Sequence, residues 1–138
     1  MIAVIDIDGV LADAAGRQRH VDKRPKDWVA FFAEVGSDDP IERGRQRLTE
    51  LSADHVIVLL SGRPESTRAD TEEWLARQGI SYSGVILRPE RDRRKAADFK
   101  AEAIGAIGEP AAVAVVIDDD PAVVERLAGL GYHVEHFR

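Results

Sequence analysis

The stretch that decides the fold is VIDIDGVLAD, residues 4–13. It completes a short β-branched apolar run, residues 1–5, which ends at two alternating carboxylates, Asp6 and Asp8, before Gly9. Such a run is typical of a buried strand, and the glycine lets the chain turn. Because ligands of open α/β sheets bind at the carboxyl ends of the strands, this strand would deliver two acids to a site. Two anions so close together need a cation or a shared proton.

Paired acids have two other interpretations. A calcium loop of the EF-hand type would need an oxygen ligand at Val10 and an acid at its twelfth position, and the sequence has neither. The second alternative is a solvated strand end that carries acids without a function. The rest of the chain decides between that alternative and a catalytic or metal site.

Length and composition restrict the classes of protein to which the chain can belong. Its 138 residues are the size of one ordinary domain. The absence of cysteine excludes disulfides, thiolate nucleophiles and cysteine-bound metals, but leaves oxygen-bound metals open. No apolar run approaches the roughly 20 residues of a membrane span, and the N-terminus enters a strand without a basic leader. We therefore expect one cytoplasmic domain, residues 1–138, without a membrane partner.

The formal net charge of −6 argues against indiscriminate nucleic-acid binding, but it hides two basic segments. Residues 14–28 hold five basic and two acidic side chains, and residues 81–100 hold six basic and three acidic ones, so each segment has a net charge of +3. Solvated basic loops are common, and this is the alternative to a function for either segment. Both segments lie near predicted strand ends, where an anionic substrate would need them.

Apolar runs that alternate with helical patterns predict the fold. The runs that indicate further strands are residues 55–60, 84–87, 111–117 and, more weakly, 132–137. Helices are predicted from Asp27, from Asp39-Pro40, between Pro64 and Gly79, over residues 92–107, and from Pro121. This alternation predicts a single, doubly wound, Rossmann-like parallel α/β sheet. Residues 14–38 would then form a small cap or lid insert.

Helical geometry distinguishes two lysines of the segment 92–107. At about 100° per residue, Lys100 lies in the middle of the apolar stripe, whereas Lys95 points to the opposite side. A lysine on an inward face needs a partner for its charge, unless it snorkels at the helix edge. Lys100 is therefore the candidate for a lysine in a site.

The predicted strand ends together supply groups that suit phosphoryl transfer. Carboxylates can hold Mg²⁺, a hydroxyl and a backbone N–H can bind phosphate oxygens, and a lysine can neutralise charge. No GxxxxGK[ST] loop occurs, which excludes a P-loop kinase or NTPase. In chain order, the groups are Asp6 with Asp8, Ser61 with Arg63, Lys100, and Asp118 with Asp119.

Through these motifs the chain resembles the haloacid dehalogenase (HAD) superfamily of phosphohydrolases over nearly its whole length. The motifs are DIDGVLAD at 6–13, LLSGR at 59–63, Lys100, and VVIDDD at 115–120. Within the superfamily it is most similar to the phosphatase domain of polynucleotide kinase-phosphatases. That closer similarity rests on Ser61-Gly62-Arg63, Asp92-Arg93-Arg94-Lys95 before Lys100, and the Asp118-Asp119 pair.

This resemblance implies an Mg²⁺-dependent phosphomonoester hydrolase that acts on a nucleotide or a nucleic-acid 3′-phosphate. Asp6 would be the nucleophile that forms an aspartyl-phosphate. Asp8 would protonate the leaving oxygen and then activate water. The metal would be held by Asp6, the Asp8 main-chain carbonyl, and Asp118 or Asp119.

The resemblance also implies how the substrate is bound. Ser61 and the Gly62 N–H would bind the phosphate, and Lys100 would balance its charge. Arg63 and Arg24 would reach the rest of the substrate.

Three other functions remain open at this point. A phosphatase of another small phosphorylated metabolite would use the same groups, and a catalytically silent relative would only bind. Response-regulator receivers are similarly sized and use an acid pair, a phosphorylated Asp and a Lys with Mg²⁺. Their phosphorylated Asp follows the third strand, however, whereas the second acid cluster here follows the fourth. Turnover of a generic aryl phosphate with Mg²⁺ would separate an enzyme from both non-catalytic alternatives.

Overall fold

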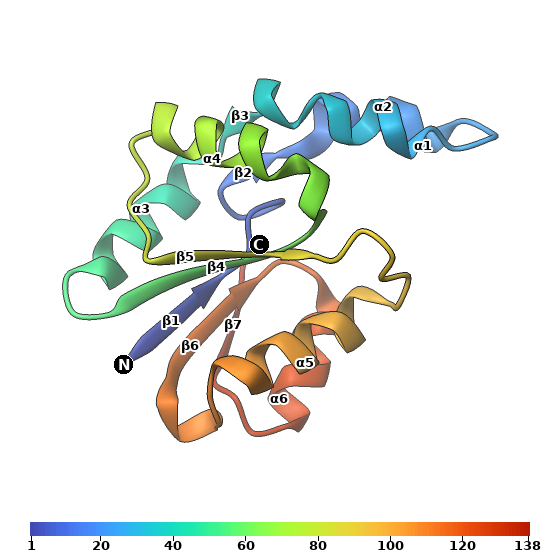
Figure 1. Cartoon of the computed structure of the whole chain (residues 1–138). Helices are drawn as coiled ribbons and strands as arrows, with labels where there is room; N and C mark the ends of the chain where they lie inside the picture. Colours follow the sequence, from blue (N-terminus) through green and yellow to red (C-terminus); the bar gives the residue numbers. More distant parts are fainter.

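The strand that carries the acid motif lies at the centre of a five-stranded sheet in the computed structural model, which describes all of residues 1–138 (Figure 1). Each strand is parallel to its neighbours, in the order β5-β4-β1-β6-β7. The strands are β1 (Ile2–Ile5), β4 (Val56–Pro64), β5 (Gly84–Arg88), β6 (Val113–Asp118) and β7 (Val134–His136). The predicted doubly wound parallel α/β sheet is confirmed.

The order of the strands creates a switch point at the site. From β1 the chain adds β4 and β5 on one side, and then crosses to add β6 and β7 on the other. The ends of β1 and β6 therefore lie side by side with connections that diverge from them. In open α/β sheets this is where ligands bind.

Helices cover both faces of the sheet (Figure 1). The helices are α3 (Glu42–Ser52) and α4 (Arg68–Arg77) on one face, and α5 (Ala96–Ile107) and α6 (Pro121–Gly129) on the other. Because side chains alternate along a strand, Ala3 and Ile5 of β1 join the core under α3 and α4, whereas Val4 joins the core under α5 and α6. Burial on both faces explains why these strands are continuous apolar runs. None of the helices has the length and apolar character needed to cross a membrane.

Residues 14–38, which we call the insert, stand apart from the sheet. The pair β2 (Ala12–Asp13) and β3 (Asp39–Pro40) is antiparallel and closes the base of the insert. The insert contains η1 (Ala14–Arg17), α1 (Arg19–Asp22), α2 (Trp28–Ala33) and η2 (Val35–Ser37). It extends past α4, and the loop between α1 and α2 projects farthest from the sheet (Figure 1). Trp74 of α4 anchors its end, because its Nε1 donates to the Asp38 carbonyl at 2.8 Å.

Three boundaries differ from those expected. Asp39-Pro40 pairs with β2 instead of starting a helix, and α3 begins only at Glu42. The helix predicted from residue 92 begins at Ala96, because Asp92 accepts the Arg94 N–H at 3.0 Å and forms a turn. Strand β4 continues to Pro64, which pairs with β5, so Ser61-Gly62-Arg63 lies within the strand.

Candidate active site

Lys100 joins the ends of β1 and β6 through their carboxylates. The Asp6 N–H donates to the Ile117 carbonyl at 3.0 Å, which brings the two strand ends together. Lys100 Nζ reaches in from α5 and lies 3.0 Å from Asp6 Oδ1 and 2.6 Å from Asp118 Oδ2. All three of these charged side chains are buried. With Asp119 they form what we call the acid cluster.

The acid cluster has the donors of a divalent-cation site. Asp6, Asp118 and Asp119 each offer a carboxylate oxygen, and these three atoms lie within 4.8 Å of one another. Ligands made only of oxygen fit Mg²⁺. Gly9 makes room for the third carboxylate: its φ is +84°, and a Cβ at this position would overlap the Asp119 side chain. A larger residue at position 9 would therefore disrupt the cluster as well as the turn.

Negative charge exceeds positive charge in the acid cluster. Burial raises the pKa of Asp6 well above its usual value, Lys100 opposes this shift, and Asp118, Asp8 and Asp119 reinforce it. Burial also raises the pKa of Asp119. Burial by itself lowers the pKa of Lys100, but Asp6 and Asp118 outweigh it and hold that pKa above its usual value. Lys100 is therefore charged, and the acids still need a proton or another cation.

Asp8 belongs to a second ion cluster, which we call the guanidinium clamp (Asp8, Arg17, Asp38 and Arg63). Arg63 donates to both oxygens of Asp8 at 3.1 and 2.8 Å, and Arg17 donates to one of them at 2.9 Å. Asp38 binds Arg17 through two hydrogen bonds of 2.7 Å and Arg63 through one of 3.2 Å. Burial alone would raise the pKa of Asp8, but Arg63 and Arg17 outweigh it, and this pKa lies below its usual value.

The clamp connects the insert to the sheet. Arg17 and Asp38 come from the two ends of the insert, whereas Asp8 and Arg63 follow or belong to strands of the sheet. The side chains of Arg17, Asp38 and Arg63 are at most 2% exposed. The position of the insert and the orientation of Asp8 therefore depend on the same ion pairs.

Two arginines expected to reach the substrate lie elsewhere. The Arg63 side chain is fully buried, and its guanidinium is taken up by Asp8, Asp38 and Thr71. Arg24 lies in the loop between α1 and α2, where it lines a separate depression with Lys23 and Lys26. Neither arginine lines the cleft over the acid cluster. The sequence did not show that Arg63 is paired with Asp8 and with the buried Asp38, or that Arg24 projects away from the sheet.

The cleft over the acid cluster has a volume of about 500 Å³. Gly62 lines the cleft, and the Arg88 guanidinium lies beside it. Ser61 is buried beside it, and its Oγ accepts the Arg63 N–H at 3.1 Å. The Ser61 O–H itself donates to no protein group, so a phosphate oxygen in the cleft could accept from it.

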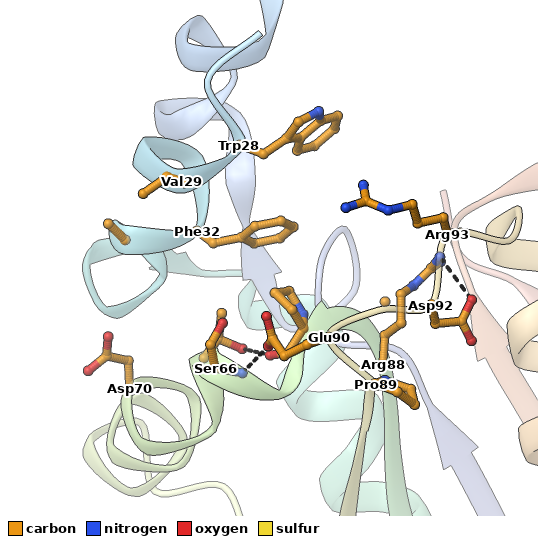
Figure 2. A pocket seen from close by; sticks show the side chains of 14 residues that line it. Trp28, Val29, Phe32, Ser66, Asp70, Arg88, Pro89, Glu90, Asp92 and Arg93 are labelled. Carbon is orange, nitrogen blue, oxygen red and sulfur yellow. Dashed lines mark hydrogen bonds and ion pairs between the residues drawn. The ribbon is translucent and has the colours of Figure 1, made fainter.

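A larger groove, of about 780 Å³, shares Gly62 with this cleft. Figure 2 shows the side chains that line this groove. We call it the aromatic groove and define it by Trp28, Phe32, Gly62, Arg88 and Arg93. Sequence reasoning predicted a helix from Asp27, which contains Trp28 and Phe32, and placed the two arginines in the basic segment of residues 81–100. It did not connect them to one another.

Asp38 and Arg17 are the site residues that sequence reasoning missed. Arg17 was counted only as one positive charge among several in the insert. Asp38 follows no motif, and its partners Arg17 and Arg63 lie 21 and 25 residues away. No local pattern could have indicated that it is the buried acid of an ion network.

The chain is similar to a known protein family and to several solved structures. The family described as the polynucleotide kinase PNKP phosphatase domain (HAD_PNKP) matches residues 1–136. No protein of curated function matches the chain. Two solved structures of the Pnkp1/Rnl/Hen1 complex, described in one of them as an RNA repair complex, each contain a chain that is 24% identical over 98% of this one, with TM-scores of 0.82 and 0.79. This chain spans 45% and 41% of those chains, which is less than half of their length.

More distant structures share the fold. A HAD-family enzyme from Bacteroides thetaiotaomicron, solved with magnesium and inorganic phosphate, is 13% identical; the match covers 98% of this chain and 92% of that one, with a TM-score of 0.61. A class C acid phosphatase from Bacillus anthracis with bound tungstate is 16% identical; the match covers 99% of this chain and 65% of that one, with a TM-score of 0.66.

Proposed function

Because this chain belongs to the family of polynucleotide kinase phosphatase domains and is a HAD-superfamily phosphatase, we propose that it is an Mg²⁺-dependent phosphomonoester hydrolase whose nucleophile is Asp6. One observation carries this assignment: Asp6 shares Lys100 with Asp118 beneath an open cleft. A carboxylate held beside a lysine, in an acid cluster that needs another cation, suits attack on a phosphate.

The first step forms an aspartyl-phosphate. A carboxylate oxygen of Asp6 attacks phosphorus, the bond from phosphorus to the leaving oxygen breaks, and Asp8 gives that oxygen a proton. Lys100 neutralises charge on Asp6 and on the phosphate. The Gly62 N–H and the Ser61 hydroxyl hold the other phosphate oxygens. When bound by Asp6, the Asp8 carbonyl and Asp118 or Asp119, Mg²⁺ supplies the remaining positive charge.

The second step returns Asp6 to its starting state. Water attacks phosphorus, the bond between phosphorus and the Asp6 oxygen breaks, and Asp8 takes a proton from the water. The guanidinium clamp supports this base role, because it holds Asp8 in one orientation and favours its anion. An incoming phosphate adds negative charge near Asp8 and so favours the protonated form that the first step uses.

The substrate we propose is a nucleotide or nucleic-acid 3′-phosphate. The family supports it, as do the related chains from an RNA repair complex. The insert of residues 14–38 acts as a minimal cap, which leaves the cleft open to a bulky leaving group. Positive charge is available beside the cleft from Arg88 and Arg93, although the chain as a whole is acidic.

A panel of phosphomonoesters tests the proposal. It should contain a generic aryl phosphate, 3′-phosphorylated oligonucleotides, nucleoside monophosphates and sugar phosphates, each assayed with Mg²⁺ and with EDTA. We expect turnover that EDTA abolishes and Mg²⁺ or Mn²⁺ restores, with the highest kcat/KM on a nucleotide class. Full activity in EDTA would refute the metal requirement, and a clear preference for sugar phosphates would refute the substrate class.

Salt dependence separates the two nucleotide classes. A single-stranded end that makes about three phosphate contacts should bind with a log–log salt slope near −2, because each contact releases counterions. A mononucleotide should show a much shallower slope.

A further inference from the structure

The wall of the aromatic groove on the insert side is formed by α2. Trp28 and Phe32 point into the groove (Figure 2), and their rings lie 5.9 Å apart between centroids with planes inclined by 23°. Trp28 remains 49% exposed, although it is the largest kind of apolar side chain. Phe31, on the adjacent side of α2, instead packs under Arg17, whose guanidinium carbon lies 4.5 Å from its ring centroid. The clamp therefore holds α2 in place while two aromatic rings stay accessible.

The opposite wall carries guanidiniums with free donors. Arg93 extends across the groove toward Trp28 (Figure 2) and takes part in no hydrogen bond or ion pair. Arg88 lies nearer to the phosphate site, and its Nε is the one buried side-chain nitrogen or oxygen in the protein that lacks a partner. The Arg88 guanidinium also lies close to Gly62: a Cβ at position 62 would be only 3.5 Å from one Nη of Arg88. The unused Nε–H of Arg88 is therefore close to the junction between the groove and the acid cleft.

The charges in the groove restrict what can occupy it. Asp70 and Glu90 also line it, so a chain of phosphates along its floor would meet carboxylates. A neutral planar group would not be repelled, and its amino groups could donate to these acids. The volume of the aromatic groove, about 780 Å³, lies within the usual range of small-molecule sites, roughly 300–1,000 Å³.

We propose that the aromatic groove is the leaving-group subsite, in which the base of the 3′-terminal nucleotide stacks against Trp28 and Phe32 opposite Arg93. Arg88 donates to the sugar–phosphate portion where the groove meets the acid cleft. This inference rests on the proposed function, because it assumes that the scissile phosphate sits over Asp6. A base offers a π-face to both an aromatic ring and a guanidinium, so these walls suit it without requiring a particular sequence.

The test compares two short single-stranded oligonucleotides with a 3′-phosphate, one intact and one whose 3′-terminal residue is abasic. Wild-type protein should prefer the intact substrate in kcat/KM by roughly tenfold, given the usual strength of base stacking on aromatic side chains. Trp28→Ala should remove most of that preference, because it should lower kcat/KM for the intact substrate much more than for the abasic one. Trp28→Phe should keep most of it. Arg93→Gln should reduce it by a smaller factor.

Arg91→Gln is the matched control for Arg93→Gln. It removes the same charge two residues away, at an exposed position that does not line the groove. The groove would not be the base subsite if Trp28→Ala and Arg93→Gln lowered kcat/KM equally for the intact and the abasic substrate. The same conclusion would follow if they lowered the preference for the intact substrate only as much as Arg91→Gln did.

Binding to a variant that lacks the nucleophile separates this inference from the proposed function. In Asp6→Asn, titration with the intact oligonucleotide should quench Trp28 fluorescence, whereas the abasic oligonucleotide should quench it much less. Trp74, the other tryptophan, is fully buried and supplies the constant background. Failure to hydrolyse any phosphomonoester would refute the proposed function, but the quenching would still decide the subsite. Equal quenching by both oligonucleotides would refute the subsite itself.

Discussion

The two ion clusters that flank the end of β1 use similar side chains but differ in charge balance. The guanidinium clamp opposes two carboxylates, Asp8 and Asp38, with two guanidiniums. The acid cluster opposes three carboxylates with the single ammonium of Lys100. A balanced, hydrogen-bonded network can be buried without a further partner, whereas an unbalanced one needs a proton or a cation. Asp8 is thus held by the balanced network, whereas Asp6, the proposed nucleophile, lies in the unbalanced one, although the two residues are only two positions apart.

This comparison assigns the largest loss of activity to the acid cluster. Asp6→Asn should remove the nucleophile and lower kcat by roughly 10⁴-fold or more, by analogy with the loss of other enzyme nucleophiles. The fold should remain, because asparagine has almost the same shape. Asp54→Asn, at an exposed position between α3 and β4, is the control. Near-native kcat in purified Asp6→Asn would mean that Asp6 is not the nucleophile.

The second prediction concerns the only cation of the acid cluster. Lys100→Ala should cost about 3 kcal/mol of transition-state stabilisation, because the charges of Asp6 and the phosphate lose their compensation. Lys95→Ala should have little effect on kcat/KM, because Lys95 is exposed at the start of α5. Steady-state kinetics on the best substrate of the panel would measure both. Equal losses in the two variants would contradict the role of Lys100.

The acid cluster was largely predictable because its positions follow from local patterns. Each strand is a contiguous apolar run, so the acids that end β1 and β6 could be placed at one edge of the sheet. The 3.6-residue period of α5 distinguished Lys100 from Lys95 before any contact was known. Both inferences need only a few neighbouring residues along the chain.

The clamp was not predictable because its partners are distant in sequence. Arg17 and Asp38 are 21 residues apart, and Arg63 and Asp8 are 55 apart. Ion pairs formed through tertiary structure leave no periodic pattern in the sequence. An arginine that is ion-paired with two carboxylates therefore cannot be distinguished, from sequence alone, from one that is free to bind substrate. The same reason explains why Asp39-Pro40, which resembles a helix start, instead pairs with β2.

The clamp should affect stability more than chemistry. Asp38→Asn leaves two buried guanidiniums with Asp8 as their only carboxylate, and the loss of a buried partner costs about 3 kcal/mol or more. We expect kcat to fall by about tenfold, because Asp8 would be held less firmly. Asp39→Asn, at the exposed neighbouring position, should change neither quantity. Denaturant unfolding and kinetics of the same preparations would measure both. A loss of activity without a loss of stability would place Asp38 in the chemistry instead.

The smallest expected effect is a pH dependence of stability that depends on Asp8. Its pKa in the folded protein lies below its usual value, since Arg63 and Arg17 outweigh burial. The folded state therefore binds fewer protons than the unfolded state near pH 4, where an unfolded Asp titrates with a pKa of about 3.9. The stabilisation is complete above that pH and is lost as the pH falls through the folded pKa.

Asp8→Asn has no such titration, so the gap in Tm between the wild type and this variant should be widest near pH 6. It should narrow steadily below about pH 4, where the wild-type carboxylate also becomes neutral. The pKa of Asp92, which Arg94 lowers to about 2, is the same in both proteins and cancels in the difference. Thermal unfolding of both proteins between pH 2.5 and 7 measures the gap. A gap that stayed constant over this range would show that the clamp binds Asp8 by shape and neutral hydrogen bonds. The contrast between a charge-balanced clamp and an unbalanced acid cluster would then fail, because the clamp would not depend on the charge of Asp8.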